Sequence, residues 1–222
     1  MSYQLLLDAV RYKLTFPDRV HIIMGNHDTA FINSSEVMKD GKEMNCAMHL
    51  ALDSLLSGKN VLHICLGQPV KKVCLWYEEV LHRISDQYEL NNTNIMWEMI
   101  LPHRFIMTFN IEDFSVKRLE ERLNDVTEQG IFFPQIVLLD GLPFNKTAQA
   151  SLSKLKALAK EHGFPVWFTV MTHRENNIEQ PDDIPSPISH MSDLFEVIVQ
   201  LKPAGREINV QLIKGQKVDK VP

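Results

Sequence analysis

The chain has 222 residues, of which 45% are hydrophobic and 23% are charged, so it can bury a substantial core. This composition argues against a largely disordered or coiled-coil chain. The formal net charge of −5 and the isoelectric point near 6.0 give no overall basic footprint for nucleic acid or for an anionic membrane.

The cysteines and the N-terminus bear on the cellular compartment. Cys46, Cys65 and Cys74 lie among apolar residues without C-x-x-C spacing, which favours buried thiols over a metal or redox site. Asp8 and Arg11 interrupt the first apolar stretch, so it lacks the pattern of a secretory signal. No apolar run approaches the roughly 18 residues needed to cross a bilayer. We therefore expect a cytoplasmic, non-membrane protein.

The first elements in chain order are a helix and a short strand. An apolar stripe predicts a helix over residues 2–14, which Pro17 ends. The apolar run over residues 20–24 predicts a buried strand, and Gly25 and Asn26 form the turn that follows it.

Further along, helices and strands alternate. Helices are predicted over residues 44–56, 70–89, 115–130 and 145–161, and strands over residues 60–66, 105–109, 135–140 and 166–171. Such alternation implies right-handed crossovers and a mainly parallel sheet with helices on both faces. Residues 175–190 read as a loop, and residues 194–201 and 207–213 as a terminal antiparallel hairpin.

A Gly-Lys pair precedes the helix at 44–56. A P-loop surrounds phosphates with backbone N–H groups at a helix N-terminus, and its lysine reaches the terminal phosphate oxygens. Gly41 and Lys42 fit this pattern, but Glu36 stands where the first glycine belongs and Glu43 where the Mg²⁺-binding Ser or Thr belongs. An ordinary turn before a helix is the alternative interpretation.

The order of elements resembles the core of the RecA/KaiC/DnaB-type P-loop ATPases over about residues 29–214. GKEMNCAMHLALDSLLSGKNVLHICL is similar to that family's phosphate loop, first helix and next strand, IVLLD at 136–140 to its Walker B strand, and LFEVIVQLKPAGREINVQLIKG to its C-terminal hairpin. The resemblance implies a three-layer α/β RecA-like fold, a mainly parallel sheet with a C-terminal antiparallel hairpin. Residues 1–28 would be an N-terminal helix-strand appendage to a domain of residues 29–222.

This resemblance also implies a site for ATP or ADP with Mg²⁺. Gly41, Lys42 and Glu43 would line the phosphate. Glu43 would set a carboxylate beside a polyphosphate, where the repulsion at about 4 Å is of order 4 kcal/mol for an effective dielectric constant near 20. We therefore favour a pseudo-ATPase over a working motor.

Two further residues of the site follow from the same resemblance. Asp140 would act on Mg²⁺ directly or through water, and His173 would sense the γ-phosphate. The family's water-activating glutamate follows the strand matched here by residues 60–66, where this chain has Gly67. The alternatives are that Asp140 caps the turn at Gly141 and that His173 is an ordinary loop histidine.

A second motif suggests a different chemistry. Residues 16–28 resemble the strand and G-N-H-D/E turn of calcineurin-like metallophosphoesterases. That resemblance implies that Asn26 ligates one metal of a pair, Mn or Fe/Zn, and that His27 polarises the phosphoryl group or protonates the leaving oxygen. That family also needs D-x-H and G-D-x-x-D-R segments upstream, and only 24 residues precede Gly25. An ordinary asparagine turn is the alternative.

Three functions are therefore carried forward. The leading one is a nucleotide-binding or pseudo-ATPase module that acts through contacts with a protein partner or with copies of itself. The alternative is a metal-dependent phosphoester hydrolase, and the third is a purely structural partner-binding protein. A nucleic-acid partner is not expected, because the chain is acidic overall.

Overall fold

The computed structural model describes residues 20–26, 42–87, 89–90, 92–145, 148–172, 184, 186–204 and 207–215. The strands are β1 (Val20–Asn26), β2 (Val61–Leu66), β3 (Arg104–Phe109), β4 (Ile136–Asp140), β5 (Val166–Thr172), β6 (Val197–Ala204) and β7 (Glu207–Lys214). The helices are α2 (Lys42–Leu56), α3 (Val70–Gln87), α4 (Thr93–Ile100), α5 (Val116–Glu128), α6 (Ala148–His162) and the short α7 (Ser186–Ser189). Short 3-10 turns cover Leu101–His103 and Ser192–Leu194.

These strands form one sheet in the order β3-β2-β4-β5-β1-β6-β7. Every neighbouring pair from β3 to β6 is parallel, and β6 pairs with β7 antiparallel. The α/β class, the mostly parallel sheet and the terminal antiparallel hairpin are therefore confirmed.

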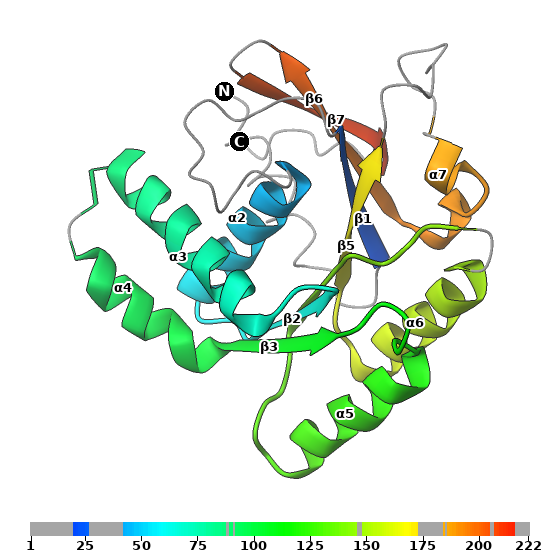
Figure 1. Ribbon diagram of the computed structural model, residues 1–222, viewed down its shortest axis with the longest axis horizontal. Helices are drawn as coiled ribbons and strands as arrows, with labels where there is room; N and C mark the ends of the chain where they lie inside the picture. Colours follow the sequence, from blue (N-terminus) through cyan, green and yellow to red (C-terminus); the bar gives the residue numbers. More distant parts are fainter. Residues whose placement is uncertain are drawn as a thin grey trace, which may run out of the picture.

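Helices cover both faces of the sheet (Figure 1). α2, α3 and α4 lie on one face, and α5, α6 and α7 lie on the other. Each face has its own apolar core, one containing Met48, Leu52 and Tyr77 and the other Leu62, Leu139 and Phe168. Because both faces are covered, all six residues of β2 are buried, including His63 within an otherwise apolar run.

The strand β1 lies inside the sheet. It pairs with β5 along one side, from Val20 with Val166 to Asn26 with Thr172, and with β6 along the other. Residues 20–26 therefore belong to the same sheet as the domain expected over residues 29–222. The boundary placed at residue 28 does not separate this strand from the rest of the fold.

Two helices differ from the sequence-based expectation. The sequence analysis did not predict α4, in which Met96, Trp97 and Ile100 pack against the core while Ile95 and Met99 are exposed. α7 lies within the stretch 175–190 that was predicted as a loop. The helix predicted over residues 2–14 lies outside the described residues. None of the helices described here has both the length and the apolar character to span a bilayer.

Candidate functional site

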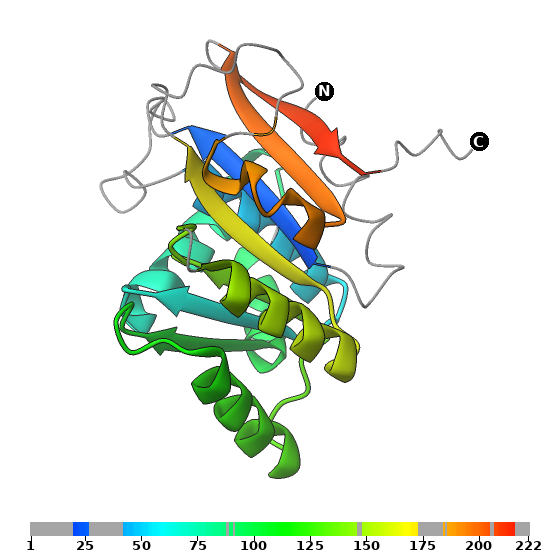
Figure 2. The same ribbon diagram turned by 90° about the vertical axis from the view of Figure 1, so that its right-hand side faces the viewer.

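The candidate site lies at the edge of the sheet where the parallel strands end. The arrowheads of β1, β2, β3 and β5 point to the same side, as the blue, cyan, green and yellow arrows of Figure 2 show. α2 follows β1 and leads back to the start of the parallel strand β2, so its first turn lies at this edge. Lys42 opens α2 and Asp140 ends β4, so both are at the same edge. Ligands of open α/β sheets bind at this edge.

Asp140 is held by side chains from two neighbouring strands. The hydroxyl of Thr169 in β5 donates a hydrogen bond to Oδ1 of Asp140. The thiol of Cys65 in β2 donates to Oδ2 at 3.6 Å. Burial raises the pKa of Asp140 above its ordinary value, and the donors Thr169, Cys65 and the Gly141 N–H oppose that rise only in part. The carboxyl group is thus desolvated and already engaged by protein donors.

The thiol of Cys65 is a donor rather than a nucleophile. Burial and the neighbouring Asp140 carboxylate raise the pKa of Cys65 far above its ordinary value. The side chain is fully buried. This agrees with the sequence-based interpretation of Cys65 as a buried thiol.

Glycines bring the strand ends close together. Gly67 after β2 and Gly141 after β4 have φ angles of +78° and +83°, which L side chains rarely adopt. The N–H of Gly67 donates to the carbonyl oxygen of Phe109 at 2.9 Å, which ties the end of β2 to the end of β3. The position that family resemblance assigns to a general base is therefore a glycine in a tight turn.

The donor set at Asp140 does not fit direct coordination of Mg²⁺. Mg²⁺ takes ionised carboxylate oxygens in near-octahedral geometry. Here both oxygens of Asp140 already accept hydrogen bonds from protein groups, and burial raises the pKa of this carboxyl group above its ordinary value. Across the described part of the chain, no three His, Cys, Asp or Glu side chains are grouped so that they could hold a metal ion.

A polar groove of about 390 Å³ lies at the same edge, beside the ends of β2 and β3 and the start of α5. The described residues that line it are Gly67, Gln68, Pro69, Thr108, Phe109, Asn110, Asp113, Arg118 and Arg122. The sequence analysis did not identify this groove. The signal that could have revealed it is a set of polar residues directly after a strand, followed by two arginines one helical turn apart.

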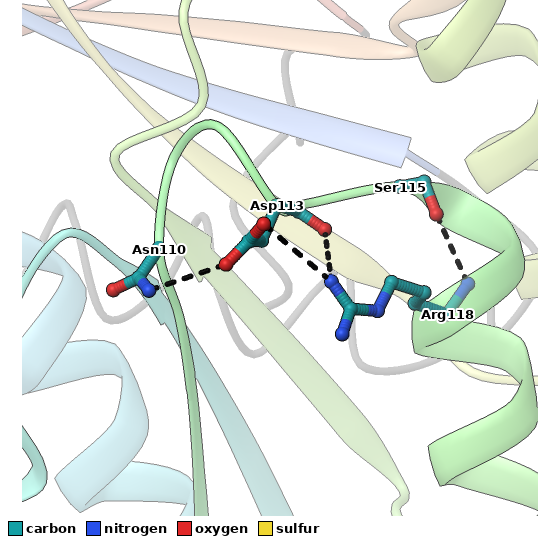
Figure 3. Close-up of polar contacts among 4 residues, drawn as sticks. All are labelled: Asn110, Asp113, Ser115 and Arg118. Carbon is teal, nitrogen blue, oxygen red and sulfur yellow. Dashed lines mark hydrogen bonds and ion pairs between the residues drawn. The ribbon is translucent and has the colours of Figure 1, made fainter.

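The first turn of α5 is held by a small polar network (Figure 3). The hydroxyl of Ser115 accepts a hydrogen bond from the N–H of Arg118 at 3.2 Å and caps the helix. The guanidinium of Arg118 donates to the carbonyl oxygen of Asp113 at 3.0 Å and lies 3.9 Å from its carboxylate. The amide of Asn110 donates to the same carboxylate at 3.3 Å.

The structure positions some of the residues predicted from the sequence and not others. Lys42 and Glu43 are the first two residues of α2, and Asn26 is the last residue of β1. Gly41, His27 and His173 lie outside the described residues. Of the sequence-predicted set, Asp140 is thus the residue whose side-chain contacts are known.

Comparisons with known proteins assign no family to the chain. No family model matches it, and no curated protein matches it in sequence. Its function is therefore inferred from its fold and from the chemistry of this edge.

Proposed function

We propose that the chain is a RecA-like nucleotide-binding module with a degenerate phosphate turn. It binds ATP or ADP weakly, it does not hydrolyse ATP at an appreciable rate, and it acts through contacts with a protein partner or with copies of itself. One observation carries the proposal: Lys42, at the start of α2, and Asp140, at the end of β4, belong to the same edge of the parallel sheet.

The strand order supports this proposal. β5 lies between β1 and β4, so one strand separates the strand before the proposed phosphate turn from the strand that ends in Asp140. The antiparallel hairpin of β6 and β7 extends the sheet beyond β1, as expected for the C-terminal hairpin of that fold.

The chemistry of the edge favours binding over hydrolysis. Gly67 stands where the resemblance would require the general base, and Asp140, at the end of the adjacent strand β4, has both carboxylate oxygens engaged by protein donors. Glu43 adds a negative charge at the start of α2, where a phosphate would bind. A repulsion of about 4 kcal/mol would weaken a micromolar nucleotide site to a dissociation constant of about 1 mM.

The test is a titration of the chain with ADP and ATP, with and without Mg²⁺, followed by nuclear magnetic resonance, which measures millimolar binding. We expect Lys42→Ala to abolish binding and Glu43→Ser to tighten it by at least about tenfold. Lys59→Ala is the matched control, because Lys59 follows the other end of α2 and lies at the opposite edge of the sheet.

Two results would count against the proposal. Absence of nucleotide binding in both the wild type and Glu43→Ser would refute the nucleotide site. ATP turnover that is lost in Lys42→Ala would refute the pseudo-ATPase part and identify an active enzyme. Sedimentation of the purified chain over a wide concentration range, with and without ATP, shows whether its protein contacts are made with further copies of itself.

A further inference from the structure

Two arginines of α5 line the groove at the ends of β2 and β3. Arg118 and Arg122 occupy positions i and i+4 of the helix, so their side chains leave the same face. The other described lining residues come from the turn after β2 and from the end of β3 and the turn that follows it. None of these residues belongs to β1 or α2, so the groove is separate from the start of α2.

Arg118 is held in place by Asp113 but keeps most of its hydrogen-bonding capacity. Its contacts with Asp113 involve Nη1. The two side chains are 54% and 61% exposed, so their attraction is screened by water and weak. The Asp113 carboxylate also accepts from Asn110, which holds the acidic group on the side of the turn. The remaining N–H groups of Arg118 can therefore serve a ligand.

Arg122 is held by an aromatic ring instead of a carboxylate. Its guanidinium carbon lies 5.0 Å from the centre of the Phe109 ring. That ring is fixed, because Phe109 is 8% exposed and meets Phe114 edge to face at 5.4 Å. Among the residues that the structure describes, no carboxylate forms an ion pair with Arg122. Stacking of this kind orients the guanidinium and leaves its N–H edge available.

The groove therefore has two arginines in different settings. Asp113 partly offsets the charge of Arg118, and no described carboxylate offsets the charge of Arg122. Its other polar lining residues, Gln68, Thr108 and Asn110, supply further hydrogen-bonding groups. Its volume of about 390 Å³ is within the range of small-molecule sites. Guanidinium groups bind phosphate through paired N–H···O bonds, which the planar edge of Arg122 allows.

From these observations we infer that the groove binds the phosphate group of a small phosphorylated molecule, with Arg122 and Arg118 as the contacting cations. This site is additional to the nucleotide site proposed at the start of α2 and does not depend on it. The ligand is a phosphate monoester small enough for the groove, and no covalent step is involved.

The test uses inorganic phosphate and phenyl phosphate as probes, with amide chemical shifts of the wild-type chain as the readout. We expect shifts in residues 67, 68, 108–113 and 116–122, and weakening of phenyl phosphate binding by about tenfold in Arg122→Gln. Arg118→Gln should also weaken binding. Lys117→Gln is the matched control, because Lys117 is 84% exposed on the same helix and is not among the groove residues.

Each other outcome has a defined meaning. Binding that is unchanged in Arg122→Gln would refute the site, as would an equal loss in Lys117→Gln, which would indicate general charge attraction. Loss in Lys42→Ala with no loss in Arg122→Gln would assign the phosphate to the start of α2 instead. Benzoate binding as tightly as phenyl phosphate would refute the phosphate assignment. Because both arginines are exposed at the surface, these variants test binding without removing core residues.

Discussion

Gly141 lies directly against the main chain of Leu66. A Cβ atom at position 141 would lie 2.6 Å from the carbonyl oxygen of Leu66, and the φ angle of Gly141 is +83°. This approach joins the end of β4 to the end of β2, immediately after Asp140. The position therefore excludes a side chain for two reasons, backbone conformation and space.

The first prediction concerns this glycine. Gly141→Ala should lower the free energy of unfolding by about 3 kcal/mol or more, because it combines a left-handed alanine with a clash against backbone. Gly163→Ala is the matched control: its φ is +70° and no atom lies within 4 Å of the added Cβ. The control should cost only about 1 kcal/mol. Urea unfolding of both variants measures the difference, and equal losses would contradict the clash.

The second prediction is the pH dependence contributed by Asp140. Its pKa is raised in the folded state above the ordinary 3.8, so the folded chain binds the proton more tightly than the unfolded chain. Its contribution to stability therefore falls as pH rises from about 4 through the raised pKa. In Asp140→Asn, the side-chain carbonyl oxygen can still accept a hydrogen bond from Thr169, and the uncharged amide nitrogen takes the place of the oxygen that faces Cys65.

We expect the stability of Asp140→Asn relative to the wild type to increase when the pH is raised from 4.5 to 8. Urea unfolding of both proteins at the two pH values measures this change. A variant that instead loses more stability at pH 8 than at pH 4.5 would show that the ionised carboxylate of Asp140 is favourable in the fold.

The third prediction concerns His63, whose contribution to folding stability changes with pH in the opposite direction to that of Asp140. Burial, with a smaller effect of the Arg104 charge, lowers the pKa of His63 from 6.5 to about 3, and its Nδ1 lies 3.2 Å from the hydroxyl of Tyr77. The unfolded chain therefore takes up this proton first as pH falls below about 6.5. The fold should lose on the order of 3 kcal/mol between pH 7 and pH 4 from this group.

His63→Gln should remove most of this loss of stability at acid pH, because glutamine does not titrate. It also keeps a hydrogen-bonding group for Tyr77. The exposed His82 in α3 provides the comparison, since His82→Gln should leave the acid-dependent loss in place. Urea unfolding at pH 4, 5.5 and 7 measures the stability of each variant. If His63→Gln loses as much stability as the wild type between pH 7 and pH 4, His63 is not the cause of that loss.

The fourth prediction concerns a small apolar void of about 10 Å³ in the core between the sheet and helices α5 and α6. Val137 is one of its lining residues, so Val137→Ile should fill it and raise the free energy of unfolding by up to about 0.8 kcal/mol. Val61→Ile, in the core on the other face, should instead destabilise by about 1 kcal/mol through overpacking. Thermal unfolding of the two variants checks the predicted difference in sign, and a loss of stability in Val137→Ile would contradict it.

Local sequence pattern determined the secondary structure and the fold class of most of the chain. The run from 61 to 66 is apolar except for His63 because the strand is buried on both faces, and the carboxylate of Asp140 marks the end of β4. Ser115 caps α5 where a hydroxyl before a helical stripe predicts it. Each of these features depends on neighbours within a few residues, so periodicity and turn residues are sufficient to predict them.

Only the tertiary structure decided what lies next to what. The inner place of β1, the position of β5 between β1 and β4, and the contacts of Asp140 with Cys65 and Thr169 join segments far apart in the chain. The groove with Arg118 and Arg122 likewise combines the ends of two strands with a helix. Parallel strands pair through long crossovers, and their order depends on how whole helices pack against the sheet. That information is not contained in the periodicity of any single segment.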